Sequence, residues 1–249
     1  MKRAWLYGMA FSCLCAAAAA QVPETGRWQE LRFASDDVDS HSEDGYIEIV
    51  VGLAAKGQLD DDPALLARVR AIGAGLIRAA QALKPASLAW QWEIHTSGAA
   101  DVEAFCMAGG KILIGSAFVR ALALDDGELA TLLGHEIAHA VAEHHHEELS
   151  EALFLTRQPR PPLDVLIKRL DSDPSLWIRL AGLSRLQESE ADQLGMVLAH
   201  KAGWPSAPML RLYAKLAAVD APAPLSGHPP ASARLSMAKG MALLFASEP

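Results

Sequence analysis

Cysteine and basic charge are both scarce in this chain. Its 249 residues include three cysteines, and 22 lysines and arginines are outnumbered by 30 aspartates and glutamates, which gives a formal charge of -8. Sequence-independent binding to nucleic acid needs a basic surface, so this composition argues against it. Hydrophobic residues make up 51% of the chain, which excludes a disordered or fibrous protein and predicts one or two soluble domains with a sizeable core.

Long apolar runs are also missing beyond the N-terminus, so no later segment is predicted to cross a bilayer. The first residues, MKRAWLYGMAFSCLCAAAAAQ, have a basic start, an apolar run and small residues that end at Ala20. This pattern is typical of a secretory signal peptide over residues 1–20. We therefore predict export of the protein, to the periplasm in a bacterium, as a mature chain without a transmembrane segment.

Two other interpretations of the N-terminus are weaker. A lipid anchor on Cys13 is disfavoured because Ala10 and Phe11 are poor residues ahead of a lipidated cysteine. A membrane anchor is disfavoured because the apolar run falls short of the roughly 20 residues needed to span a bilayer. Removal of residues 1–20 would leave Cys106 as the only cysteine, which excludes an intrachain disulfide and predicts a small buried apolar residue there.

The first half of the chain predicts one long helix and one small sheet. Residues 21–58 lack sustained periodicity and predict a loosely packed N-terminal segment, in which 46–53 are compatible with a short strand. Apolar residues at helical spacing, with prolines near both ends, predict an amphipathic helix at 60–83. Alternating and apolar runs at 88–97 and 103–122 predict a small sheet that ends in a helix.

Helical patterns fill the second half. Asp125 and Asp126 open a helix whose apolar residues recur at intervals of three and four, and further helices are predicted at 174–201, at 206–219 and ending near Phe245. Proline-rich loops separate these segments. No internal repeat is present, so residues 59–249 are predicted to form one mostly helical α+β domain, with the small sheet beside the helix that Asp125 opens.

The stretch GHEIAHAVAEHHHEEL, residues 134–149, carries the strongest chemical signal. His135-Glu136-Ile137-Ala138-His139 matches HExxH, which places two imidazoles one helical turn apart on the same face. Two neutral imidazoles in this arrangement can bind one Zn²⁺, and Glu136 can take a proton from a bound water as general base. Catalytic zinc has three protein ligands as a rule, so a third must come from elsewhere in the chain.

The segment RLQESEADQLG, residues 185–195, offers three acids for that position. Glu188 and Asp192 are four residues apart and share a helix face, whereas Glu190 points nearly the opposite way. One member of the Glu188 and Asp192 pair can bind the metal while the other orients a ligating imidazole. An exposed acidic helix face is the alternative interpretation of this segment.

HExxH followed about fifty residues later by ESEADQLG resembles the zinc metallopeptidase family that includes the CAAX prenyl endopeptidase and HtpX, and most closely its soluble bacterial periplasmic branch. The resemblance covers roughly residues 60–245 and implies a zincin-like metallopeptidase domain. It implies one zinc ion per chain, held by His135, His139 and Glu188, with Asp192 orienting a ligand.

AFCMAGGKILI, residues 104–114, is similar to the NAF..PGG segment of that family, whose strand lies beside the active-site cleft and can pair with an extended substrate. The resemblance implies that Ala104, Phe105, Gly109 and Gly110 bind substrate. Glu103 and Ala108 replace the usual asparagine and proline, which leaves the geometry of the substrate strand open. A plain buried hairpin is the alternative.

GHPPASAR, residues 227–234, resembles the late HPP...R segment of the family. It implies a place for His228 near the metal, where its imidazole either fills the fourth position and closes the site or donates to the oxyanion. Simple exposure in a loop is the alternative. The trio His144, His145 and His146 is predicted to be solvated surface near a helix end.

The sequence thus predicts a zinc-dependent endopeptidase in which Glu136 activates the attacking water. The family resemblance and the predicted export imply unfolded or misassembled cell-envelope proteins as substrates. A non-catalytic, chaperone-like binding module that keeps the zinc fold is the alternative function.

Overall fold

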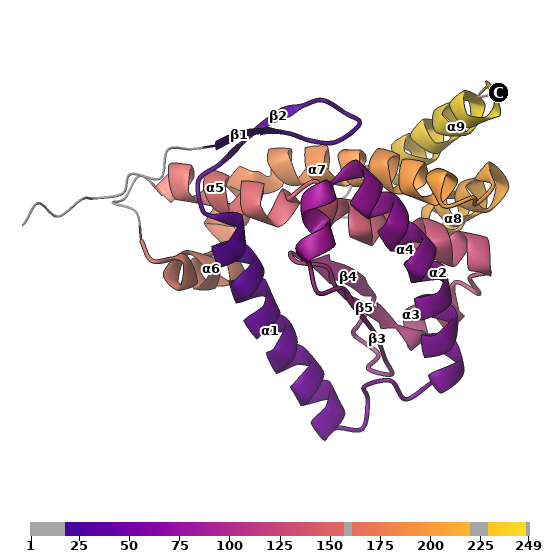
Figure 1. The fold of residues 1–249 in the computed structure, drawn as a ribbon, viewed down its shortest axis with the longest axis horizontal. Helices are drawn as coiled ribbons and strands as arrows, with labels where there is room; N and C mark the ends of the chain where they lie inside the picture. The colour runs from indigo at the N-terminus through magenta and orange to yellow at the C-terminus, as the bar shows by residue number, and fades with distance from the viewer. Residues whose placement is uncertain (1–17, 157–160, 220–228, 248–249) are drawn as a thin grey trace, which may run out of the picture.

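The computed structural model describes residues 18–156, 161–219 and 229–247, which form a mostly helical α+β body with two small sheets (Figure 1). The predicted fold class is confirmed. Residues 1–17 of the signal peptide predicted at 1–20, with Cys13, lie outside the described residues, and so does His228, whereas residues 18–20 are part of a strand. None of the helices in the described part of the chain has the length and apolar character that a bilayer crossing needs.

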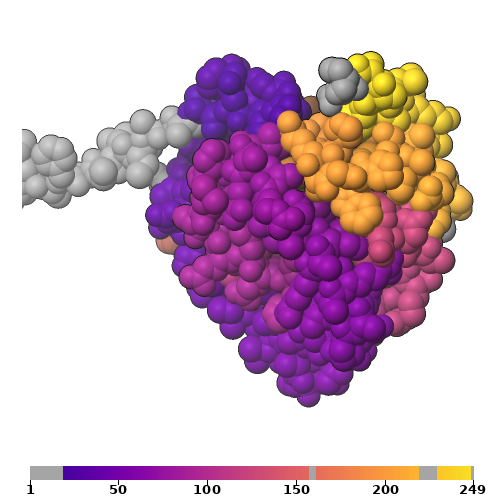
Figure 2. Space-filling model, turned by 45° about the vertical axis from the view of Figure 1, so that its right-hand side comes forward, coloured from indigo at the N-terminus to yellow at the C-terminus, as the bar shows by residue number. Residues whose placement is uncertain are grey.

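The N-terminal segment is folded, and the loose packing predicted for residues 21–58 is wrong. Strands β1 (Ala18–Gln21) and β2 (Trp28–Leu31) pair as an antiparallel hairpin, and helix α1 (Ser35–Ala55) follows them. In the space-filling view the indigo N-terminal residues pack against the orange part of the chain (Figure 2). The hairpin is therefore part of the folded body.

Helix α1 also replaces the short strand considered at 46–53. Val38, Tyr46 and Leu53 are buried and recur at intervals of eight and seven residues, which is a helical spacing. The Tyr46 hydroxyl donates to the carbonyl oxygen of Ile112 at 2.8 Å. Apolar residues between these anchors stay in water, as Val51 does at 61% exposure. Packing of one face against the sheet outweighs the strand preference of the β-branched residues.

The predicted small sheet is present, with the strand order β3-β5-β4. Its strands are β3 (Glu93–Ser97), β4 (Ala104–Met107) and β5 (Lys111–Gly115). Strand β5 is parallel to β3 and antiparallel to β4. The β4–β5 turn contains Gly109 and Gly110 at φ 75° and 81°, the left-handed conformation that favours glycine. A short 3₁₀ helix at Pro85–Ala89 delays the start of the first strand beyond the predicted position.

The remaining helices account for most of the chain. They are α2 (Pro63–Leu83), α3 (Ser116–Ala121), α4 (Asp126–Val141), α5 (His144–Thr156), α6 (Leu163–Ser172), α7 (Pro174–Lys201), α8 (Ser206–Val219) and α9 (Ala231–Ser247). The helices predicted at 60–83, 174–201 and 206–219 and the last helix are confirmed. Helix α6 is not predicted from the sequence.

Helix α4 runs through the centre of the fold. The Asp125 carboxylate accepts from the Glu128 backbone N–H at 2.9 Å, and the Glu128 carboxylate accepts from the Asp125 N–H at 2.8 Å, which fixes where the helix begins. Leu129, Leu133 and Ile137 are completely buried in the main core, where α4 meets α2, α7, α8 and β4. The predicted apolar face of this helix is therefore the centre of the core.

The stretch 134–149 spans two helices and not one. Helix α4 ends at Val141, and Glu143 has a φ of 56°, a left-handed conformation that interrupts a helix. Helix α5 then packs against α7 and β2. The change of direction carries the histidines after His139 into the body of the protein.

Helices α4 and α7 touch backbone to backbone at two glycines. A Cβ added to Gly134 would lie 2.6 Å from the carbonyl oxygen of Gly195, and one added to Gly195 would lie 2.6 Å from the backbone nitrogen of His135. Real Cβ atoms do not approach backbone this closely. The two glycines therefore set the separation of the two helices that carry the predicted ligands.

We predict that Gly195→Ala lowers the free energy of unfolding by about 1–3 kcal/mol, because the added methyl group overpacks a backbone contact. Gly182→Ala is the matched control in the same helix, since a Cβ there meets nothing within 4 Å. The control is expected to be neutral or to stabilise by up to about 1 kcal/mol, because alanine is the better helix former. Urea denaturation of both variants measures the difference, and equal values would contradict this account of the contact.

Candidate metal centre

Three side chains meet where α4 crosses α7. The Nε2 atoms of His135 and His139 are 3.2 Å apart, and the carboxylate oxygens of Glu188 lie 3.4 Å from each of them. A tetrahedral zinc ion with bonds of about 2.1 Å has ligand-to-ligand distances of about 3.4 Å. The cluster thus has both the donor types and the dimensions of a three-ligand zinc site.

The arrangement of the acids on α7 follows the predicted helix faces. Glu188 and Asp192 both face His135, whereas Glu190 points to the other side and reaches Arg27 and His144. The exposed acidic face considered as an alternative is not what the fold presents, because Glu190 and Asp192 are buried. The sequence identified the three acids and their directions, but not the buried partners of Glu190.

Asp192 fixes the orientation of His135. Its Oδ1 lies 3.0 Å from the Nδ1 of His135, which leaves Nε2 directed at the cluster. Arg234 of α9 donates to both carboxylate oxygens at 2.8 and 2.6 Å, and the Tyr213 hydroxyl of α8 donates to Oδ1 at 3.0 Å. Burial alone would raise the pKa of Asp192, but the bonds from His135 and Arg234 hold it below 3.8.

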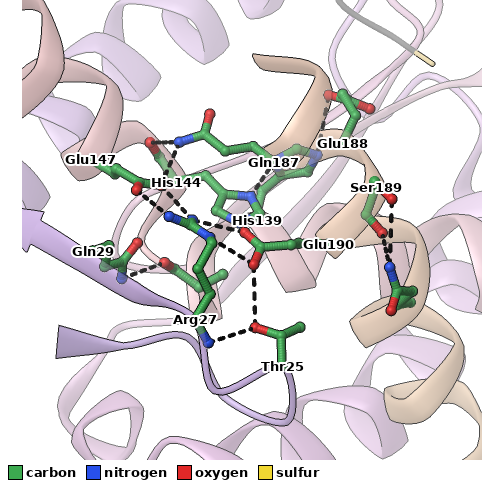
Figure 3. A network of polar contacts seen from close by, with 12 residues as sticks. Thr25, Arg27, Gln29, His139, His144, Glu147, Gln187, Glu188, Ser189 and Glu190 are labelled. Carbon is green, nitrogen blue, oxygen red and sulfur yellow. Dashed lines mark hydrogen bonds and ion pairs between the residues drawn. The ribbon is translucent and has the colours of Figure 1, made fainter. Parts of the chain in front are cut away.

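His144 plays the corresponding part beside His139. Their Nδ1 atoms are 3.0 Å apart, and the two rings meet edge to face (Figure 3). His144 and His146 are only 2% and 3% exposed, so the prediction of a solvated trio is wrong for these two. His145 alone is partly exposed. The physical reason is the left-handed break at Glu143, which a count along one continuous helix does not reveal.

The pKa values of the two clustered histidines are shifted in opposite directions. Burial lowers the pKa of His135, but the hydrogen bonds that its ring donates to Asp192 and Glu188 outweigh burial and raise the pKa to about 10. Burial and the nearby charge of His135 push the pKa of His139 well below 6.5. These opposite shifts favour protonation of His135 over protonation of His139.

A cavity of about 280 Å³ opens beside the cluster. Its walls are Glu136, His139 and Glu188 from the two ligand helices, Phe105, Cys106 and Ala108 from β4 and its turn, and Val38, Asp39 and Trp90 from the N-terminal half. Glu136 thus faces the same cavity as two of the three ligand side chains. This is the position that a base acting on a water near the cluster requires.

The predicted substrate residues are only partly on the wall of this cavity. Phe105 lines it, whereas Gly109 lines a neighbouring one and Ala104 lines neither. Gly110 lies against the indole of Trp92, where a Cβ would come within 2.6 Å of the ring. Cys106 lines the cavity and is not fully covered, although burial and nearby Glu136 raise the pKa of its thiol well above the usual range.

Four residues of the polar network around this centre were not identifiable from the sequence: Arg27, Glu147, Tyr213 and Arg234. Arg234 is part of the segment GHPPASAR, but nothing in the pattern shows that its guanidinium pairs with Asp192. The one available signal is general, because a buried carboxylate needs a cationic or hydrogen-bonding partner. That rule does not say which of 22 lysines and arginines supplies it.

Comparison with known proteins gives a family match. The model of peptidase family M48 matches residues 63–159 and 166–242. The chain is 33% identical over 142 residues to the mitochondrial metalloendopeptidase OMA1 of Arabidopsis thaliana, which covers 55% of this chain and 29% of that protein. It is 34% identical over 123 residues to the Bos taurus metalloendopeptidase OMA1, and this match covers 45% of the chain and 23% of the relative.

The yeast relative, OMA1 of Saccharomyces cerevisiae, is 30% identical over 138 residues, with 51% of this chain and 37% of the relative covered. The chain thus spans well under half the length of these relatives. The family match itself covers more than half of the chain, and both of its segments contribute to the cluster, the first with His135 and His139 and the second with Glu188. On this ground the chain belongs to peptidase family M48.

Proposed function

We propose that this protein is a zinc-dependent endopeptidase whose metal is held by His135, His139 and Glu188. The observation that carries the proposal is the near-tetrahedral spacing of the three ligand atoms, 3.2 to 3.4 Å, next to a cavity that Glu136 lines. Bound zinc would supply Lewis acidity for peptide-bond hydrolysis. The match to a peptidase family supports the same reaction class.

Glu136 has the role of general base in this proposal. Its carboxylate takes the proton of the attacking water and returns it to the leaving amine when the peptide bond breaks. Asp192 keeps the ring of His135 in one orientation, and His135 itself is buried. The fold thus holds in place both the proposed base, Glu136, and the residue that orients His135, Asp192.

The proposed substrates are polypeptides in an unfolded or extended state. Strand β4 is an edge strand of its sheet, and Phe105 on it lines the cavity, which supports pairing with an extended chain. The signal-peptide pattern of residues 1–20 supports export, and with it the proposal that cell-envelope proteins are cut. The assignment of His228 to a gate or an oxyanion donor stays a prediction from the sequence.

Metal analysis combined with cleavage of unfolded casein tests the proposal. Wild-type protein is expected to carry about one zinc ion and to cleave, and His139→Ala to lose the metal. Glu136→Gln is the sharper variant, because it should keep its zinc and lose turnover by about 10²-fold or more. Equal turnover in Glu136→Gln would refute the assigned base. Bound zinc without cleavage by the wild type would favour the non-catalytic module.

Zinc affinity should also depend on pH. The pKa of His135, raised to about 10, means that the metal-free site holds a proton throughout the neutral range, and binding must displace it. A higher pH removes this competition, so the apparent affinity is expected to rise about tenfold per unit between pH 6 and pH 8. Competition with a chelator of known affinity measures the slope. A flat dependence would show that the pair holds no such proton.

A further inference from the structure

His139 has a hydrogen-bonding role on both sides of its ring. Its Nε2 faces His135 and Glu188, which leaves Nδ1 to carry the proton when Nε2 binds a metal. That Nδ1 lies 3.0 Å from the Nδ1 of His144. His139 is then the donor and His144 the acceptor, and the proton of the neutral His144 ring must be on its Nε2.

The Nε2 of His144 points at a carboxylate. It is buried and lies 3.5 Å from Oε2 of Glu190, a separation longer than a good hydrogen bond but close enough for the charge of Glu190 to favour a proton on this nitrogen. The Gln187 amide donates to the backbone oxygen of His144 at 3.0 Å and holds the residue in place. The position of Glu190 thus favours the tautomer of His144 that can accept from His139.

Arg27 determines where Glu190 sits. Its Nε and Nη2 donate to the two Glu190 oxygens, each at 2.8 Å, and its Nη1 and Nη2 donate to Glu147 at 2.5 and 2.7 Å (Figure 3). Thr25 adds a bond to Glu190 at 3.2 Å. One guanidinium therefore joins two buried carboxylates on α5 and α7, and lysine has no equivalent planar fork.

This arginine comes from the N-terminal hairpin. Arg27 lies between β1 and β2 and outside the residues that match the peptidase family. Hydrogen bonds from Val22 N–H to the Arg27 oxygen at 2.8 Å and from Gly26 N–H to the Val22 oxygen at 3.0 Å close the turn. The predicted cleavage after Ala20 would remove three of the four residues of β1, but it would leave every residue that takes part in these two turn bonds.

We propose that the N-terminal hairpin is part of the metal centre, with Arg27 as a positioning residue that acts on His139 through Glu190 and His144. The inference rests on the proposed zinc site. In this proposal, His139 is connected to Arg27 through His144 and Glu190. His135 is connected to Arg234 through Asp192 in the same way. The hairpin contributes to metal affinity without touching the metal.

Zinc affinity in purified variants, measured by chelator competition, tests this role. His144→Leu removes the acceptor and is expected to weaken binding by about 10- to 100-fold, the usual effect of losing a partner of a ligating histidine. His144→Asn should restore most of the affinity, because its amide oxygen can accept from His139. Arg27→Met should weaken binding in the wild-type background and add no further loss in His144→Leu.

Glu24→Gln is the matched control. Glu24 lies in the same turn and pairs with Lys201 at 3.6 Å, so its loss disturbs the hairpin without altering the contacts of Glu190. Its zinc affinity should equal that of the wild type. Circular dichroism of the metal-free proteins checks folding, and Arg27→Lys, which keeps the charge without the fork, provides a milder variant with a smaller expected loss.

Two results would overturn the inference. Unchanged zinc affinity in both Arg27 variants would show that the hairpin has no influence, and losses that multiply in the Arg27→Met and His144→Leu double variant would show that Arg27 does not act through His144. An error in the proposed zinc site would give a different result. The wild type would then bind no zinc, or His139→Ala would retain its zinc.

Discussion

The backbone contact between α4 and α7 is the constraint on which the metal centre depends. Gly134 precedes the first predicted ligand, and Gly195 lies seven residues, about two helical turns, after Glu188. With no side chain at either position, the helix axes come close enough for the Glu188 oxygens to lie 3.4 Å from both imidazoles. The spacing of the three side chains is thus a consequence of helix packing.

Burial of charge is the second constraint. It explains why the N-terminal hairpin and α9 both pack beside the candidate metal centre. Asp192, Glu190 and Glu147 are buried carboxylates, and each one needs a cation close by. Arg234 of α9 serves the first, and Arg27 of the N-terminal hairpin serves the other two. Removing one partner of such a buried pair costs about 3–5 kcal/mol as a rule. The hairpin and α9 therefore supply the cations that these buried carboxylates need.

The sequence predicted what depends on local periodicity and failed where long-range contacts decide. HExxH and the four-residue spacing of Glu188 and Asp192 place side chains on one helix face, so the direction of each acid could be predicted. The helix of residues 35–55 could not, because Val38, Tyr46 and Leu53 are too far apart to stand out among exposed apolar neighbours. The burial of His144 depends on a single left-handed residue, Glu143, and the pairing of Arg27 joins residues 163 positions apart. Neither the burial of His144 nor the pairing of Arg27 produces a periodic pattern in the sequence.

We propose that His135, His139 and Glu188 together hold one zinc ion. X-ray absorption at the zinc edge of the loaded protein tests it most directly, because the method reports the type and distance of the ligand atoms. We predict two imidazole nitrogens at about 2.0–2.1 Å together with oxygen ligands and no sulfur. A zinc ion bound through sulfur, or through fewer than two imidazoles, would contradict the proposed site.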